Sequence, residues 1–380
     1  MISFFFRPSV GGLETHMDDL CRYLSSSSHR TFVVTFQPLT NQKSDRILER
    51  RGNLTVYRIP GPLHNMFYRF QSRTMLRYVL LTPLLLVASL FVMSLHRREI
   101  DVVHCHDLNS AALCAFVSWM FGKRSVITVH YVQDFIDPSS TSAFNRFGRR
   151  ILSHFDAVIA ISGSVGDRLA PLLGDRERIV TMTNWIDLSM FSPADKAGGK
   201  RAAGFENSFV VLFVGRMVST KGVELVVQAA SMLADMKDVK FVLIGQGPLA
   251  PMVQRASATL GNIVYTGPQS IESLREYYRL ADVLVVPSTY EEGFGRVIME
   301  ALACGTPVIG SKRGAIPEAM DESVGLLIEP TAEALAAAVV ELHDRKSELD
   351  SLASGCRSYA ERRFGEGNAI AVLKAYGWRK

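Results

Sequence analysis

The sequence contains few cysteines, and their positions indicate no scaffold built on them. There are five among 380 residues, and no two of them form a Cys-x-x-Cys pair. An odd and scattered set argues against a disulfide framework and favours a reducing compartment. A secretory signal is also missing, because the apolar segment Ile2–Phe6 is too short for one and no basic stretch precedes it. We therefore expect a cytoplasmic protein.

Signatures of nucleic-acid binding are absent as well: the sequence has no zinc-finger spacing, no RNP sequence and no basic helix of that kind. The net charge is only +5, and it is unevenly placed, with +6 on residues 1–190 and −1 on the remainder. The N-terminal half should therefore meet an anionic partner, such as a nucleotide, a lipid phosphate or a membrane surface, and not nucleic acid.

No apolar run reaches the length of about 20 residues that a transmembrane helix usually needs. The longest, residues 79–95, spans 17 residues and contains Pro83. Arginines precede it at helical spacing: Arg69, Arg73 and Arg77. Two interpretations follow. The run is a helix buried in the core, or it lies on a membrane surface with the arginines facing anionic headgroups. The second would make residues 69–98 a peripheral contact at the cytoplasmic face of the membrane.

Short β-branched runs alternate with helical stretches along the whole chain, which is typical of parallel sheets covered by helices on both faces. Thirteen strands are predicted: 2–6, 31–36, 54–59, 101–106, 125–130, 157–162, 179–184, 209–215, 240–245, 263–267, 282–288, 307–311 and 324–328. Helices are predicted at 13–27, 70–98, 110–121, 142–155, 221–235, 271–280, 295–304 and 331–346. One open sheet of ordinary width cannot hold so many strands, so we expect two α/β domains.

The domain boundary is expected where small and polar residues interrupt the hydrophobic pattern. We predict an N-terminal domain over 1–190, a linker over 191–207 and a second domain over 208–365. A last helix, 366–380, could pack on either domain.

The segment from Glu292 to Glu300 carries the strongest chemical signal. It follows the Val-rich predicted strand 282–288, so strand, glycine-bearing turn and helix start come in that order. Its two carboxylates are eight residues apart, about two helical turns, and nearly share one face. Backbone N–H groups at the helix start suit an anion, and the carboxylates suit sugar hydroxyls. The plainer interpretation is a strand–helix unit with a surface glutamate at each end.

Other predicted strands end in residues of the same kind, and ligands of open α/β sheets lie beyond those ends. Gly11 and Gly12 follow the first strand and open a helix, so a backbone could approach an anion closely there. Gly215 precedes Arg216, and Lys221 follows five residues later. Two such cations can neutralise a diphosphate, and the alternative is a solvated basic turn.

Two neighbouring histidines could suggest a metal site, but the sequence does not support one. His104 and His106 alternate on a strand, and no third ligand is near them in the sequence, so no metal site is predicted. A lone histidine at a strand end, such as His130, is more often structural. The segment Gly245-Gln-Gly247 resembles half of a dinucleotide fingerprint, but Ala250 stands where the third glycine belongs, so the signal for NAD is weak.

Taken together, these segments resemble the retaining, nucleotide-sugar-dependent glycosyltransferases of family 4, which have the GT-B fold. The resemblance is carried by Glu292-Gly-Phe-Gly-x4-Glu300, the Gly11-Gly12-x-Glu14 loop, Gly215-Arg216 with Lys221-Gly222, and the segment Asn184-Trp-Ile-Asp187. It spans nearly the whole chain and implies two Rossmann-like domains, each doubly wound, that face each other across a cleft. The first domain would be on the acceptor side, and the second would bind the nucleotide sugar.

The resemblance also implies roles for single residues. Arg216 and Lys221 would hold and stabilise the departing diphosphate, and Glu300 would bind the ribose hydroxyls. Glu292 and His130 would lie by the transferred sugar. The remaining donor contacts would come from backbone groups: Gly11, Gly12, Gly215, Gly293, Phe294 and Gly295. No metal and no other cofactor is expected.

These residues predict transfer of a hexose from a UDP- or GDP-sugar to a glycan or lipid-linked acceptor, with retention, in the synthesis of a surface polysaccharide or glycolipid. A nucleotide-sugar epimerase on the same fold, an inverting transferase with His16 or Glu14 as base, and a non-catalytic nucleotide-sugar-binding subunit are alternatives. One departure from the family pattern is Trp185, where glycine is usual. The long apolar run 79–95 is another.

Overall fold

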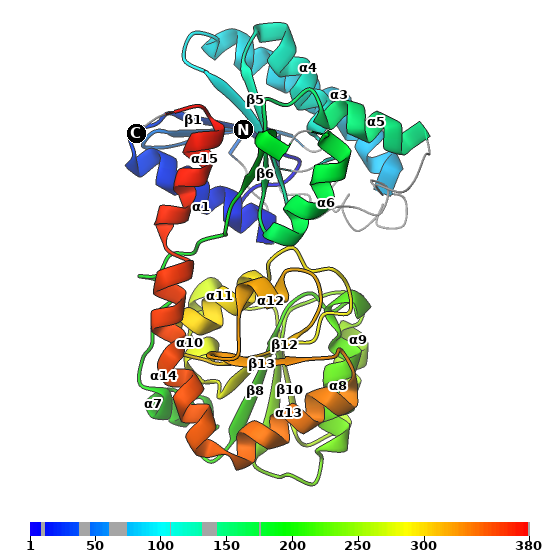
Figure 1. Ribbon diagram of the computed structural model, residues 1–380. Helices are drawn as coiled ribbons and strands as arrows, with labels where there is room; N and C mark the ends of the chain where they lie inside the picture. Colours follow the sequence, from blue (N-terminus) through cyan, green and yellow to red (C-terminus); the bar gives the residue numbers. More distant parts are fainter. Residues whose placement is uncertain are drawn as a thin grey trace. The chain divides into compact units, whose positions relative to one another are not determined.

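The computed structural model describes residues 1–8, 12–37, 46–60, 74–106, 108–130, 143–174 and 176–378, and structural statements below concern these residues. The chain forms two compact units (Figure 1). Unit 1 comprises Met1–Asn184 together with Gly367–Lys380, and unit 2 comprises Trp185–Glu366. The chain therefore leaves unit 1 once and returns to it at its C-terminal end.

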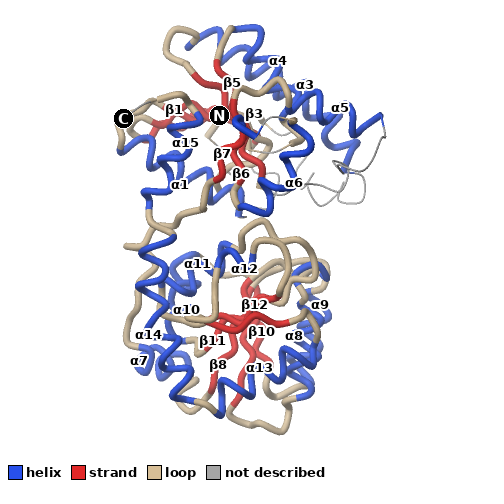
Figure 2. The backbone as a smooth tube through the Cα atoms, viewed as in Figure 1, coloured by secondary structure: helices blue, strands red, loops and turns tan. Residues whose placement is uncertain are grey.

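Unit 2 is built on a six-stranded, entirely parallel sheet with the order β10-β9-β8-β11-β12-β13. Its strands are β8 (Phe209–Val214), β9 (Val239–Ile244), β10 (Ile263–Gly267), β11 (Val283–Val286), β12 (Val308–Ser311) and β13 (Gly325–Ile328). Its helices are α7 (Lys196–Ala203), α8 (Val223–Met232), α9 (Ala250–Thr259), α10 (Ile271–Leu280), α11 (Arg296–Ala303), α12 (Ile316–Ala319), α13 (Ala332–Asp344) and α14 (Lys346–Arg363). Figure 2 shows helices on both sides of these strands.

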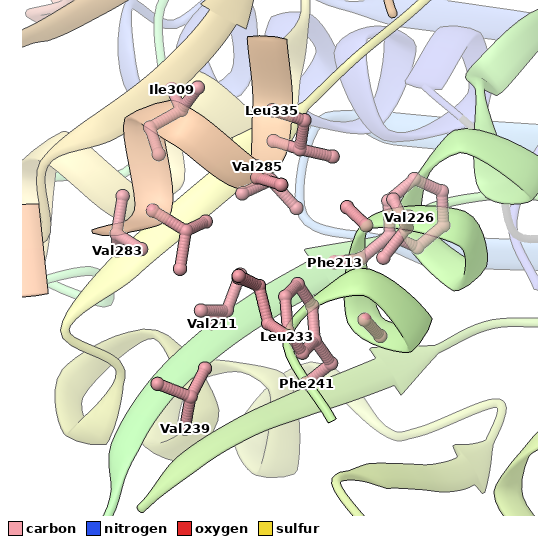
Figure 3. Packing of buried hydrophobic residues seen from close by; sticks show 14 of the residues in the cluster. Val211, Phe213, Val226, Leu233, Val239, Phe241, Val283, Val285, Ile309 and Leu335 are labelled. Carbon is pink, nitrogen blue, oxygen red and sulfur yellow. The ribbon is translucent and has the colours of Figure 1, made fainter. Parts of the chain in front are cut away.

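Strands buried on both faces must be apolar throughout, and the central strands of unit 2 are. In β8 and β11, Val211, Phe213, Val283 and Val285 point to one face and meet residues of α8 and α13, among them Val226 (Figure 3). This continuous core holds the sheet rigid, so the loops at the ends of its strands start from fixed positions.

Unit 1 has the same architecture with one antiparallel edge. Its strands are β1 (Thr31–Phe36), β2 (Leu48–Arg51), β3 (Leu54–Ile59), β4 (Val102–Cys105), β5 (Arg124–Val129), β6 (Ala157–Ala160) and β7 (Ile179–Thr181). They form the runs β1-β3-β2 and β4-β5-β6-β7, and Ile2 bridges both by pairing with Val34 and Cys105. Only β2 is antiparallel to its neighbour.

The helices of unit 1 are α1 (Gly12–Ser26), α3 (Thr74–His96), α4 (Ala111–Phe121), α5 (Ala143–Leu152), α6 (Gly163–Leu173) and, from the C-terminal end, α15 (Ile370–Ala375). Helix α15 contacts β6 and β7. The hydroxyl of Tyr376 lies 2.8 Å from Nδ1 of the buried His104, and the Trp378 ring stacks on His29 with ring centroids 4.4 Å apart. These contacts fix the C-terminal segment on unit 1.

The two doubly wound α/β units predicted from the sequence are confirmed, with local differences. The predicted strand 2–6 is not a regular strand: Ile2 forms isolated bridges to Val34 and Cys105. The expected linker 191–207 contains α7, which packs on α10 and whose Lys200 is paired with Asp282. Helices α6, α9 and α14 were not predicted. Among the described residues, no helix combines the length and the apolarity needed to cross a bilayer.

Candidate functional site

The order of the strands in unit 2 marks one place for a ligand. Strand β8 comes first in this sheet, and the chain then adds β9 on one side of it and β11 on the other. Loops that leave β8 and β11 at their carboxyl ends therefore diverge and leave a crevice, which is where ligands of open α/β sheets bind. The residues from Gly215 to Lys221 follow β8, and those from Pro287 to Gly295 follow β11.

Close backbone contacts join these two loops. Gly222 has φ +72°, and a Cβ there would lie 2.1 Å from the carbonyl oxygen of Pro287, so the position admits only glycine. The N–H of Thr289 donates to the carbonyl of Thr220 at 3.1 Å. The two loops therefore form one surface, and Lys221 lies opposite Glu292.

Lys221 and Glu292 form the central ion pair of this surface. The Lys221 ammonium lies 2.6 Å and 2.8 Å from the two carboxylate oxygens of Glu292. The hydroxyls of Ser288 and Tyr290 donate to the same carboxylate at 3.1 Å and 3.4 Å. Burial by itself would lower the pKa of Lys221, but Glu292 and Tyr290 outweigh it and the pKa is raised. Lys221 is thus a fixed positive charge near neutral pH.

Arg216 supplies a second positive charge nearby. It follows Gly215, whose carbonyl oxygen would be 1.9 Å from a Cβ at Gly245, so the loops after β8 and β9 also touch. Burial raises the pKa of Tyr290, while the positive charges of Lys221 and Arg216 lower it. Both cations are therefore close enough to Tyr290 to interact with it electrostatically. Arg216 is exposed and forms no ion pair with any residue that the structure describes.

The turn after Glu292 leads into helix α11. Gly295 caps that helix with φ +73° and offers no side chain, so the helix start is open to a polar ligand. Phe294 is buried, with its ring edge-on to Phe364 at 6.0 Å, and its side chain anchors the turn. Gly314 packs directly against the backbone of this turn. A Cβ at Gly314 would lie 2.4 Å from backbone atoms of Glu292, so a side chain there would push the turn away.

Glu300 lies two turns along α11 and is held by two partners. Tyr278 donates its hydroxyl to one carboxylate oxygen at 2.8 Å, and Arg296 contacts the other at 2.9 Å. Glu300 is 8% exposed, so it is an oriented acceptor at the edge of the core. Sequence reasoning missed Tyr278, which comes from α10 and carries no signal in the sequence. It also missed the bonds that Ser288 and Tyr290 make.

Unit 1 brings together three histidines at the corresponding edge of its own sheet. His16 lies in α1, which Gly12 opens, while His106 follows β4 and His130 follows β5. The His16 ring lies 5.0 Å from that of His130 and 5.8 Å from that of His106, centroid to centroid. Gly11 lies outside the described residues. Burial lowers the pKa of His130 to about 4, so its imidazole is neutral at pH 7.

His104, which the sequence pairs with His106, has a different role. Its Nδ1 lies 2.8 Å from the Tyr376 hydroxyl and its Nε2 lies 2.8 Å from that of Thr128. Both ring nitrogens are therefore occupied in the core. The sequence could not tell the two histidines apart, because alternation on a strand says which faces they occupy and not what lies there.

The structure thus groups Arg216, Lys221, Glu292 and Glu300 with the glycine-bearing turn in unit 2. It places Gly12 and His130 in unit 1. The group in unit 2 offers two cations and an open helix start to an anion, and an oriented carboxylate to hydroxyls.

Comparison with known proteins agrees with this chemistry. Residues 10–190 match the family model described as Glycosyltransferase Family 4, and residues 208–345 match the model described as Glycosyl transferases group 1. A D-inositol 3-phosphate glycosyltransferase of Geodermatophilus obscurus is 33% identical over 243 residues, which are 60% of this chain and 53% of that protein. The chain therefore matches about half the length of that relative.

Solved structures share the fold over almost the whole chain. The sucrose-phosphate synthase of Thermosynechococcus elongatus aligns with a TM-score of 0.78 at 22% identity, covering 99% of this chain and 97% of that one. The Anabaena protein HepE in complex with UDP and glucose aligns with a TM-score of 0.76 at 19% identity, covering 99% and 98%. At these identities the likeness concerns the fold, and both units have the architecture of GT-B glycosyltransferases.

Proposed function

The chain belongs to the glycosyltransferases of family 4 and group 1, and from this membership we propose that it transfers a hexose from a nucleoside diphosphate sugar to a hydroxyl, with retention at the anomeric carbon. The proposal rests on one group of side chains: Arg216, Lys221, Glu292 and Glu300. They lie near the carboxyl ends of β8 and β11, where the loops of the unit 2 sheet diverge. UDP in the HepE structure supports a nucleotide as the ligand of this fold.

Each of these residues answers one need of that reaction. As the diphosphate departs, negative charge develops on its oxygens, and fixed cations at that position lower the barrier. Lys221 and Arg216 supply this charge. The carboxylate of Glu300 accepts hydrogen bonds from the ribose hydroxyls and fixes the nucleotide. Glu292 holds Lys221 in place and lies by the sugar ring, which becomes oxocarbenium-like as the bond to the phosphate breaks.

A neutral histidine suits the sugar better than a charged one. The low pKa of His130, which burial causes, leaves its imidazole able to donate or accept a hydrogen bond without adding charge beside an electron-poor sugar. We assign His130 to contact with the transferred hexose. Because two cations and a helix start neutralise the diphosphate, the reaction needs no divalent metal, and EDTA should leave the rate unchanged.

The acceptor is a glycan or a lipid-linked saccharide, and an exposed apolar surface supports the lipid-linked alternative. Helix α3 is apolar on all sides. One face is buried, with Leu81, Leu85 and Val92 in the core. The opposite face presents large side chains to solvent: Leu80, Leu84, Val87, Phe91 and Leu95. The neighbouring α4 adds three more: Phe116, Trp119 and Met120.

This α3–α4 surface, defined by those eight side chains, resembles a membrane contact more than a protein interface. Val87 is 67% exposed and Trp119 is 77% exposed, which is unusual for large apolar residues of a monomer. The exposed Arg97 and Arg98 border it, and residues 1–190 carry the net positive charge of the chain. Apolar side chains rimmed by arginines fit an anionic bilayer. Of the arginines expected to take part, Arg69 and Arg73 lie outside the described residues, as does the side chain of Arg77.

The test of the reaction is the anomeric configuration of the product. The protein is incubated with a donor sugar and a hydroxyl acceptor, and the new linkage is examined by NMR. Retention supports the proposal, whereas inversion indicates a transferase with a general base. A donor-only incubation separates the epimerase alternative, since only an epimerase isomerises the sugar without an acceptor. Binding of the donor without any turnover would indicate a non-catalytic subunit.

A further inference from the structure

Three imidazoles of unit 1 meet at one point. His16, His106 and His130 come from three segments that converge at the carboxyl edge of the sheet. Each contributes one ring nitrogen to a set in which all three atoms lie within 4.8 Å of one another. His16 and His106 are buried, with 2% and 0% exposed, and His130 is half-buried. The cluster is therefore largely buried among the described residues.

Two of the three histidines, His106 and His130, have ring nitrogens without a hydrogen-bond partner. Both nitrogens of His106 and Nε2 of His130 are buried, and none of them has a hydrogen-bond partner among the described residues. His104, next to them on β4, has partners for both nitrogens. Buried polar atoms without partners are rare in folded proteins, and an unseen ion or water is a common reason for them. A neutral imidazole has a lone pair on one of its two ring nitrogens, and this nitrogen is the one that can ligate a metal.

We propose that His16, His106 and His130 bind one divalent transition-metal ion, with Zn²⁺ as the best match. Imidazole nitrogens suit Zn²⁺, Cu²⁺ and Ni²⁺, whereas Mg²⁺ and Ca²⁺ require oxygen ligands. Because the three atoms lie within 4.8 Å of one another, a central ion would be at most about 2.8 Å from each, so shifts of at most about 0.7 Å give a Zn–N distance of about 2.1 Å. Three histidines leave a fourth position open for water or a substrate oxygen.

Such an ion would oppose the reaction. A ring nitrogen of His130 that ligates a metal cannot also bond to a sugar hydroxyl, so we expect occupancy of the site to inhibit transfer. This consequence rests on the proposed function, but metal binding does not. Zinc inhibition is also compatible with a reaction that needs no metal, because the diphosphate is neutralised by side chains of unit 2.

The test is a titration of the whole, metal-free protein with Co²⁺, which reports a four-coordinate site through its visible absorption. We expect one Co²⁺ per chain, displaced by Zn²⁺. His106→Asn and His16→Gln should each weaken binding at least about 100-fold, and His154→Gln, at an exposed histidine of the same unit, should leave it unchanged. Circular dichroism establishes that each variant is folded. Two variants guard against the loss of one to misfolding.

Two results would overturn the site: no stoichiometric Co²⁺ binding by folded wild-type protein, or affinities of both variants within about twofold of the wild type, which would indicate surface binding only. Transfer assays with added Zn²⁺ test the consequence separately. Inhibition of the wild type that His106→Asn relieves supports it. Binding without inhibition would leave the metal site standing and exclude its effect on transfer, and a protein with no transfer activity at all would contradict the proposed function alone.

Discussion

The ammonium of Lys221 lies 2.6 Å and 2.8 Å from the two carboxylate oxygens of Glu292, which is 71 residues further along the chain. The pair closes the gap between the loops after β8 and β11, and Ser288 and Tyr290 complete the bonding of the carboxylate. Without this carboxylate, the Lys221 ammonium would have no fixed position. Paired, it presents its charge at a fixed point before a ligand arrives, which is the condition under which a cation lowers a barrier most.

Lys221→Ala and Arg216→Ala should each lower kcat by about 10²–10³, equivalent to about 3–4 kcal/mol, because each removes a positive charge from the departing diphosphate. Their effects on stability should differ. Arg216 is exposed, so its loss should not change Tm, whereas loss of Lys221 leaves the Glu292 carboxylate without its cation and should lower Tm. Steady-state kinetics and thermal unfolding check both points.

The matched control is Lys312→Ala, an exposed lysine of the same unit outside the loops after β8 and β11. It should retain normal kinetics. A kcat within twofold of the wild type in either Arg216→Ala or Lys221→Ala would remove that residue from the reaction.

Tyr278→Phe tests whether the orientation of Glu300 matters. The substitution deletes the hydroxyl that holds one carboxylate oxygen at 2.8 Å and leaves the packing of the ring. A hydrogen bond to a charged group is worth about 1.5–3 kcal/mol, so the KM for the donor should rise by about 10-fold or more while kcat changes little. Glu300→Gln should raise it further. Equal kinetic constants for Tyr278→Phe and the wild type would show that Glu300 needs no such support.

The buried imidazoles make the stability of the folded chain depend on pH. Burial lowers the pKa of His130 from 6.5 to about 4, and those of His104 and His106 also fall well below 6.5. Between these pH values the unfolded chain binds more protons, so the free energy of unfolding should fall as pH drops from about 6.5 to about 4. Above about 6.5 the histidines are neutral in both states and contribute nothing. His130→Asn should flatten this part of the Tm profile, and a profile identical to that of the wild type would contradict the assignment.

Replacing Phe91 and Trp119 by serine should reduce binding to vesicles, because both lie on the exposed α3–α4 surface. Co-sedimentation with vesicles of phosphatidylglycerol and of phosphatidylcholine measures the effect, and the anionic vesicles should bind more of the wild type. Met232→Ser, at an exposed methionine of unit 2, is the control. Equal pelleting of the double variant and the wild type would exclude the membrane contact. A dimer of the wild type that the double variant abolishes would assign the surface to a second copy.

The sequence predicted the elements whose residues carry their own pattern. The strands at Thr31–Phe36 and Leu54–Ile59 are β-branched and aromatic, and they occur where they were expected. Strand β2 was missed because three of its four residues are charged, and it forms at the sheet edge, where Glu49 pairs with the buried Arg58. Helix α7 was missed because two glycines interrupt it, and tertiary contacts such as Lys200 with Asp282 hold it in place.

In the candidate site as well, local patterns predicted single residues but not the contacts between them. Glu292 and Lys221 stood out because each lies at a strand end with adjacent glycine, and the parallel order of the strands brings such ends together. Their contact, the support that Tyr278 gives Glu300, and the cluster of His16 with His106 and His130 join segments far apart in the chain. Local sequence patterns do not predict such long-range contacts, because these contacts depend on strand order and on the loops between strands.

The most direct test of the central claim is donor binding by variants of the two cations. Thermal unfolding is followed with a panel of UDP-, GDP- and ADP-sugars, since a ligand at 100 times its Kd stabilises the folded state by about 2.7 kcal/mol. One donor should raise the Tm of the wild type and of Lys312→Ala, and should raise that of Arg216→Ala and Lys221→Ala far less. A Tm increase of the same size in all four proteins would show that the diphosphate is not held by Arg216 and Lys221.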